Sequence, residues 1–182
     1  MSKILITGAN GFIGAAVCKH LRQSRIHMLT GTTRVPGVRV GPERIPMHYI
    51  PEIGPETDWT QAVSSANIVV HLAARVHLMK DKDIDPLAAY RRVNTEGTKA
   101  LATQAAAAGV KRFVFVSTVK VIGEVSPDGG FTESSPAEPK DAYSMSKWEA
   151  EQGLIEISKT TGMEVVILRP PLVYGRCVKG NF

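Results

Sequence analysis

Three glycines at a strand-to-helix junction constrain this chain more than any other feature. The apolar run from Ile4 to Ile6 is typical of a fully buried strand, and apolar residues at helical spacing begin after Gly11. Gly8, Gly11 and Gly14 stand at the turn between the two. Without a Cβ at these positions, a pyrophosphate can reach the N–H groups of the helix N-terminus. We therefore expect a nucleotide site in which Gly8 makes the tight turn, Gly11 allows close approach and Gly14 packs helix on strand.

Buried strands and helical segments alternate along the rest of the chain. Further strands are expected at 26–32, 47–50, 68–72, 113–116 and 164–168, and helices at 58–64, 86–109 and 142–160. Asp58 is expected to cap the first of these helices. Because right-handed crossovers between parallel strands place helices on both faces of a sheet, this order predicts an α/β fold, a Rossmann-like doubly wound parallel sheet. We expect the whole length, 1–182, to form one dinucleotide-binding domain.

Composition and charge exclude several classes of protein. Apolar residues make up 43% of the chain and charged residues 21%, as in soluble globular proteins. No apolar run has the length of a membrane span, there is no signal-peptide layout, and Cys18 and Cys177 do not suggest a disulfide framework. We therefore expect a cytoplasmic protein without a membrane segment or a metal site. The formal net charge is +5, but the basic residues are scattered, which favours an anionic ligand over nucleic acid.

A second group of residues suits acid–base chemistry. Tyr143 and Lys147 are four residues apart, so on a helix their side chains share a face. A neighbouring ammonium lowers the pKa of a phenol, which suits a general acid or base acting on an alcohol or ketone. Ser117 and Thr118 follow the predicted 113–116 strand, at the sheet edge where ligands of such folds bind. A hydroxyl there can bond the same substrate oxygen.

The order of these motifs resembles that of the extended short-chain dehydrogenases/reductases, within the NAD-dependent epimerase/dehydratase family. The resemblance covers the whole chain and is carried by Thr7-Gly8 to Gly14, His71-Leu72-Ala73-Ala74, Asn94 to Thr98, Ser117-Thr118, the Tyr143/Lys147 pair and Arg169-Pro170. It implies that Tyr143 is the acid/base and that Lys147 lowers its pKa and holds the nicotinamide ribose. Thr118 matches the catalytic Ser or Thr of the family, and Asn94 would support the site.

The resemblance also implies a larger set of ligand contacts. Cofactor contacts are expected at Gly8, Asn10, Gly11, Phe12, Ile13, Gly14, Arg34, Glu52, Ile53, Leu72, Ala73, Ala74, Asn94, Ser117, Tyr143, Lys147, Pro170 and Leu172. Substrate contacts are expected at Thr118, Lys120 and Asn181.

Three departures from the family pattern bear on function. Val119-Lys120 replaces the Asp-Glu pair of the dehydratases, so elimination of water is not expected. Val121-Ile122-Gly123 stands in place of Val-Tyr-Gly and puts an apolar residue beside the sugar site. Arg34 follows the second strand where NAD-specific members have an acid. It either pairs with a 2′-phosphate, which favours NADP(H) over NAD(H), or is a surface arginine in a loop.

The runs 119–124, 168–175 and 178–182 narrow the resemblance to bacterial enzymes that act at C4 of UDP-N-acetylhexosamines in surface-polysaccharide synthesis. The activity implied is hydride transfer at C4 of a UDP-sugar, by a 4-epimerase or a 4-keto reductase. The family also implies a homodimer formed through the helices carrying Asn94 and Tyr143, and a C-terminal substrate domain beyond this chain. The alternatives are a non-catalytic NADP-sensing protein on the same fold, which often lacks the Tyr/Lys pair, and an RNA-binding relative.

Overall fold

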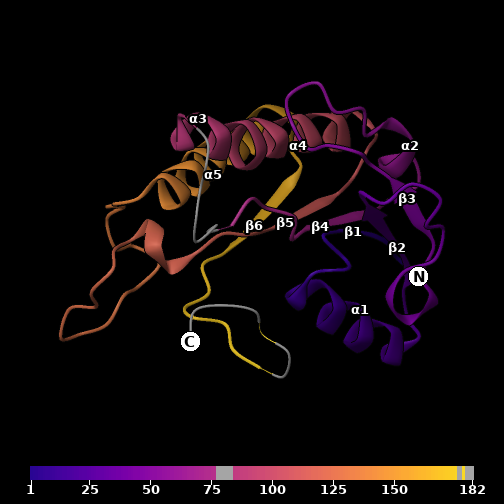
Figure 1. The fold of residues 1–182 in the computed structure, drawn as a ribbon, viewed down its shortest axis with the longest axis horizontal. Coiled ribbons are helices and arrows are strands. Elements are labelled where there is room, and N and C mark those ends of the chain that lie inside the picture. The colour runs from indigo at the N-terminus through magenta and orange to yellow at the C-terminus, as the bar shows by residue number, and fades with distance from the viewer. Residues whose placement is uncertain (77–83, 176–177, 179–182) are drawn as a thin grey trace.

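A parallel sheet with strand order β3-β2-β1-β4-β5-β6 forms the centre of the molecule (Figure 1). The computed structural model describes residues 1–76, 84–175 and 178. The strands of this part are β1 (Lys3–Thr7), β2 (Met28–Thr33), β3 (Met47–Tyr49), β4 (Ile68–His71), β5 (Arg112–Val116) and β6 (Glu164–Leu168). The strand order is that of a doubly wound Rossmann-like sheet, so the predicted fold class is confirmed.

Helices lie on both faces of the sheet. Figure 1 shows α1 on one face and α2 to α5 on the other. The helical segments are α1 (Phe12–Ser24), η1 (Pro42–Arg44), α2 (Thr60–Val63), α3 (Pro86–Tyr90), η2 (Arg91–Glu96), α4 (Gly97–Ala107), η3 (Val119–Val121) and α5 (Ala142–Thr161). Within the described ranges, no helix is both long enough and apolar enough to cross a membrane.

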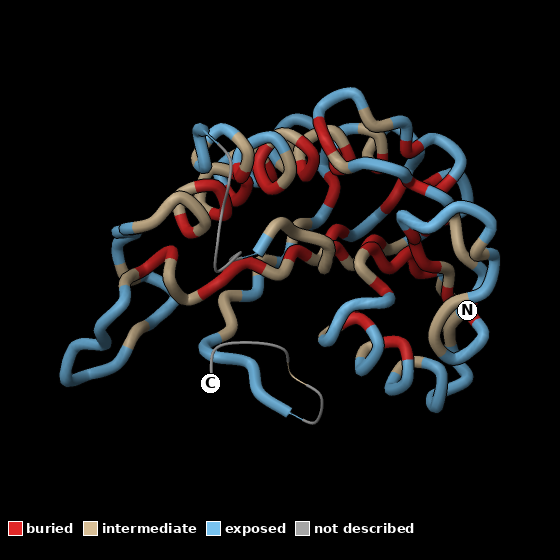
Figure 2. The backbone as a smooth tube through the Cα atoms, viewed as in Figure 1, coloured by how far each residue is buried: buried red, intermediate tan, exposed pale blue. Residues whose placement is uncertain are grey.

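Alternation along the strands divides the core into two layers. Leu5, Val69, Phe113 and Phe115 pack with the helices of the α4–α5 face, whereas Ile4 and Ile6 pack with α1. This is the period-two pattern of a sheet buried on both sides. The burial is uneven, because Val166 is 38% exposed and Leu168 is 48% exposed on the edge strand β6 (Figure 2).

The boundaries of several elements differ from those predicted. β2 begins at Met28 instead of residue 26, because pairing with β1 starts there, at Lys3. The helix predicted at 86–109 is α3, η2 and α4 in succession, and η2 has π-helical hydrogen bonding. The helix predicted at 58–64 is the single turn α2. Its N-cap is Trp59, although the Asp58 carboxylate still accepts a bond from the N–H of Thr60 at 2.9 Å.

Candidate active site at the carboxyl edge of the sheet

The glycine turn between β1 and α1 has the geometry that its sequence predicts. Gly8 has a φ of +67°, a conformation that side chains rarely adopt, and a Cβ there would lie 2.8 Å from the N of Ala73. A Cβ on Gly14 would run into the carbonyl oxygen of Gly8, and one on Gly11 would lie 3.1 Å from the same oxygen. Gly11 is the N-cap of α1 and has no side chain to occupy the first N–H groups of the helix. The turn thus leaves these N–H groups to an anion.

A buried chain of hydrogen bonds joins the ends of β1 and β4. The Thr7 hydroxyl lies 2.7 Å from Nδ1 of His71 and accepts bonds from the N–H groups of Leu72 and Ala73 at 3.2 Å. Nε2 of His71 lies 3.0 Å from the Thr98 hydroxyl on α4. Burial, together with the charge of Lys147, lowers the pKa of His71 to about 3, so the ring is neutral at neutral pH. This chain fixes the segment 71–74 against the glycine turn.

Asn94 holds the first turn of α5 through a buried network. Its side-chain oxygen accepts from the N–H of Arg75 at 2.8 Å, and its amide donates to the Arg75 carbonyl at 3.0 Å and to the Ser146 hydroxyl at 3.1 Å. Ser146 in turn donates to the carbonyl of Tyr143 at 2.7 Å. Asn94 lies in the π-helical segment η2, and such segments occur frequently at functional sites. Asn94 therefore connects the segment after β4 to the first turn of α5, and its support of a site stays a prediction.

Tyr143 and Lys147 are on the inward face of α5, and Thr118 follows β5. Asp141 and Ser144 form a capping box that starts α5 two residues before Tyr143. The Tyr143 ring meets that of Tyr90 edge-on, with centroids 6.1 Å apart. Lys147 is 2% exposed, and its Nζ lies 3.9 Å above the centroid of the Phe115 ring.

The pKa values of this pair differ from the expectation. Burial, followed by the charges of Asp141 and Tyr90, raises the pKa of Tyr143 to about 12. Burial lowers the pKa of Lys147 to about 7, an effect that the charge of Glu151 partly opposes. The predicted lowering of the phenol pKa by Lys147 is therefore not found in the free site, because burial disfavours both charged forms.

Ser117 and Thr118 lie where the chain after β6 passes them. The N–H of Ser117 donates to the Leu168 carbonyl at 2.7 Å, and the N–H of Val119 donates to the Pro170 carbonyl at 3.0 Å. Thr118 is the N-cap of η3 and accepts a bond from the N–H of Lys120 at 3.3 Å. The buried Ser117 hydroxyl has no hydrogen-bond partner in the described part of the chain, so it is available to a ligand.

The remaining predicted contacts lie in three different settings. Lys120 forms an ion pair with Asp141, and Glu52 pairs with Arg92 at 2.9 Å, so both charges are engaged within the protein. Arg34 is exposed just after β2, at the carboxyl edge of the sheet, as predicted. Asn10 and Leu172 are exposed, whereas Ile53 packs against the core under α4. Asn181 lies outside the described residues.

Sequence reasoning did not identify the part played by Glu151. This residue lies one helical turn beyond Lys147, is fully buried, and accepts bonds from Nη2 of Arg169 at 2.6 Å and from its Nε at 3.2 Å. The pair ties α5 to the segment that leaves β6. The available signal was the spacing of Tyr143, Lys147 and Glu151, which places all three on one helical face.

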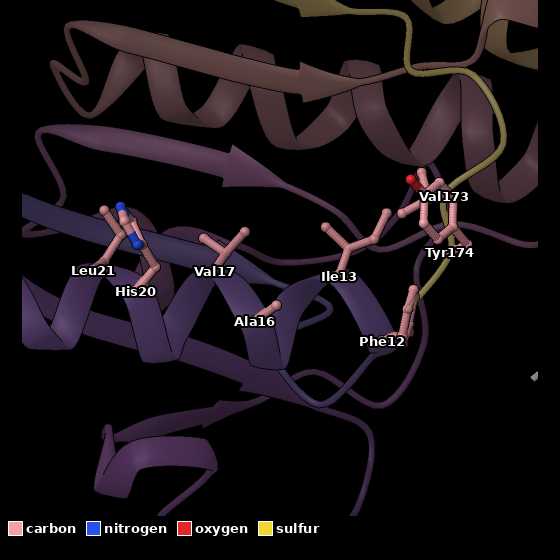
Figure 3. Close-up of a pocket in the computed structure, with 8 residues that line it drawn as sticks. All are labelled: Phe12, Ile13, Ala16, Val17, His20, Leu21, Val173 and Tyr174. Carbon is pink, nitrogen blue, oxygen red and sulfur yellow. The ribbon is translucent and has the colours of Figure 1, made fainter. Parts of the chain in front are cut away.

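An apolar groove of about 400 Å³ lies along α1, beside the segment that follows β6 (Figure 3). It is lined by Phe12, Ile13, Ala16, Val17, His20, Leu21, Val173 and Tyr174. The side chains of Phe12 and Ile13 face this groove, so a cofactor at the glycine turn would meet their backbone N–H groups instead. Among the described residues, no group of three or more His, Cys, Asp or Glu side chains is placed to hold a metal ion.

The glycine turn, the Tyr143/Lys147 pair and the hydroxyls after β5 are arranged as in a Rossmann-like domain of the short-chain dehydrogenase/reductase type. The chain belongs to the NAD dependent epimerase/dehydratase family, whose model matches residues 4–181. The predicted family is therefore confirmed.

Among curated relatives, a UDP-glucose 4-epimerase of Vibrio cholerae is 41% identical over 180 residues, which are 98% of this chain and 54% of the relative. An Escherichia coli O157:H7 protein, N-acetyl-alpha-D-glucosaminyl-diphospho-ditrans,octacis-undecaprenol 4-epimerase, is 28% identical over 98% of this chain and 51% of its own length. The solved structure of UDP-glucuronic acid 4-epimerase from Bacillus cereus in complex with NAD superposes with a TM-score of 0.77 at 27% identity, over 95% of this chain and 57% of that one. The chain thus spans about half the length of the curated relatives it matches.

Proposed function

We propose that this chain is the cofactor-binding part of an enzyme that transfers hydride at C4 of a UDP-sugar, either a 4-epimerase or a 4-keto reductase. The observation that carries the proposal is that the glycine turn, Thr118 and the Tyr143/Lys147 face of α5 meet at one edge of one sheet. Relatives and structural neighbours named as UDP-sugar 4-epimerases support it.

The residues present fit a nicotinamide dinucleotide. A Cβ at Gly8 or Gly14 would collide with the backbone of segment 72–73 or of the turn itself, so these glycines let the turn close and bring the N-terminus of α1 to a pyrophosphate. Gly8, Gly11 and the N-terminus of α1 would hold the pyrophosphate, and Lys147 would hold the nicotinamide ribose. The chemistry that such a cofactor would supply here is hydride transfer at the sugar C4.

The chain's own residues would handle the proton on the sugar 4-oxygen. Thr118 would orient that oxygen by hydrogen bonding, and Tyr143 Oη would take or give its proton. A ligand that excludes water beside the Lys147 ammonium would strengthen their electrostatic coupling, which favours the phenolate. The Asn94 network keeps Tyr143 in place, because Ser146 bonds its carbonyl at 2.7 Å.

Three finer statements belong to the same proposal. Arg34 would pair with a 2′-phosphate, so NADP(H) would bind better than NAD(H). Two copies would associate through the α3–η2–α4 helical stretch that carries Asn94 and through α5, which carries Tyr143, and the protein would act in the cytoplasm.

The test of the activity is Tyr143→Phe in the whole enzyme that contains this chain. The substitution keeps the ring but removes the ionisable group, so turnover should fall by at least about 100-fold while cofactor affinity is unchanged. Tyr90→Phe is the matched control, because it removes a neighbouring phenol whose hydroxyl bonds the Val76 carbonyl at 3.3 Å. Wild-type turnover in Tyr143→Phe would show that the proton is handled elsewhere.

The division of the enzyme into two parts has a separate test. The contacts to the dinucleotide lie in the glycine turn, α1 and α5, whereas holding a sugar against the nicotinamide requires a pocket that we assign to a separate substrate domain. We expect residues 1–182 alone to bind NAD(H) or NADP(H) by calorimetry and to show negligible turnover of any UDP-sugar. Measurable turnover by these residues alone would refute the division.

A further inference from the structure

The Lys147 ammonium rests on an aromatic ring in the core. Its Nζ lies 3.9 Å from the centroid of the Phe115 ring, within the range of a cation–π contact. Phe115 is fully buried on β5, and its other ring contact is His71, stacked at 5.9 Å with an interplanar angle of 16°. The Phe115 ring therefore contacts both the neutral imidazole of His71 and the ammonium of Lys147.

Other charges near Lys147 are engaged elsewhere. Glu151, one turn along α5, is held by Arg169 in a bidentate ion pair, with the shortest contact at 2.6 Å. His71 on β4 is neutral, and Tyr143 on α5 is protonated at neutral pH. On the elements packed against α5, Lys120 of η3 pairs with Asp141, and Arg91 of η2 pairs with Glu149. The face of the Phe115 ring is the electron-rich group that lies against the Lys147 ammonium.

We propose that Phe115 is a positioning residue for Lys147: its ring face holds the ammonium over β5, charged and aimed along the inner face of α5. This inference rests on the proposed function, in which Lys147 must be a cation to hold the ribose and stabilise the phenolate. Burial lowers the pKa of Lys147, and the charge of Glu151 opposes this only in part. The negative face of an aromatic ring also opposes that lowering.

The chain offers a matched control two residues upstream. Phe113 is on the same strand and the same face and is equally buried. It also contacts His71 with centroids 5.9 Å apart, but at an interplanar angle of 53°. The cation–π contact of Lys147 is with Phe115. A change that acts only through packing should therefore have similar effects at both positions, whereas one that acts on the cation should be confined to Phe115.

The experiment replaces Phe115 with mono-, di- and trifluorinated phenylalanine in the whole enzyme. Fluorine withdraws electron density from the ring face at nearly constant ring size, so folding is preserved while the cation–π attraction weakens step by step. The pKa of Lys147 is followed by NMR of its labelled Cε in the ligand-free protein, with Lys147→Arg for assignment. We expect a stepwise fall of the Lys147 pKa by about half to one unit across the series, and none when Phe113 is fluorinated.

The pH profile of kcat/KM gives a second readout, because it reports groups of the free enzyme. Its alkaline limb should move to lower pH with the Lys147 pKa, so that activity lost at high pH is recovered when the pH is lowered. The inference would be overturned, even in an active enzyme, if fluorination of Phe115 left the Lys147 pKa unchanged. It would also be overturned if fluorination of Phe113 lowered that pKa equally. If the Lys147 pKa falls across the Phe115 series but the protein has no UDP-sugar turnover, the contact is upheld. That result would count against the proposed function instead.

Discussion

The two faces of the sheet are covered by helices to different extents. On the α4–α5 face, Phe113 and Phe115 are fully buried, and the catalytic candidates lie in a closed hydrogen-bond network. On the α1 face, α1 lies beside β1 and β2, and no described helix lies beneath β5 and β6 (Figure 1). Val166 and Leu168 are partly exposed there. The candidate acid–base residues Tyr143 and Lys147 therefore lie on the more completely covered face, whereas the glycine turn leads into the helix of the less covered one.

The contrast predicts unequal losses of stability on truncation. Phe113→Ala should lower the free energy of unfolding by about 3–5 kcal/mol, because it leaves a cavity in the closed layer. Leu168→Ala should lower it by less than about 1 kcal/mol in residues 1–182, since the side chain is already half in solvent. Urea unfolding of both variants measures the difference. Equal losses would mean that the two faces are packed alike.

Acid should weaken the closed side first. The folded-state pKa of His71 is about 3, below its ordinary value of 6.5, so the folded protein binds fewer protons than the unfolded chain between these values. The stability from neutral His71 is complete above pH 6.5 and is lost as the pH falls toward 3, by roughly 4–5 kcal/mol. His71→Gln should flatten this part of the stability–pH curve. An unchanged slope in that variant would place the acid sensitivity in another group.

A smaller effect, on ligand binding, is expected at Arg34 just after β2. Arg34→Ala should weaken NADP(H) binding by about 1.5–3 kcal/mol, the size of a charge-assisted contact, and leave NAD(H) binding nearly unchanged. Arg39→Ala, on the same loop and also exposed, is the control. Calorimetry with both cofactors decides the matter. Similar losses for the two cofactors, or none, would remove the case for a 2′-phosphate pocket.

Local sequence was enough to predict most of the fold and the positions of the candidate site. The glycine turn, the buried strands and the Tyr143/Lys147 spacing depend on neighbours within a few residues. Boundaries were harder, because Ile26 suits a strand by composition but has no partner beyond Lys3 on β1. The π-helical segment and the Glu151–Arg169 pair depend on packing between distant segments. So does the ring beneath Lys147, and no local pattern encodes that contact.

Because η2 is π-helical, the number of residues in it sets how the helix faces before and after it are oriented. Each residue of an α-helix turns the chain by about 100°, and a π-type turn takes in one extra residue. The faces before and after η2 are therefore out of phase: Tyr90 before it faces the Tyr143 ring, and Leu101 after it faces the core. Deleting any one residue of η2 would rotate one of these faces out of place, whereas replacing the exposed Arg91 would leave both. We therefore expect this segment to tolerate a substitution better than the deletion of a residue.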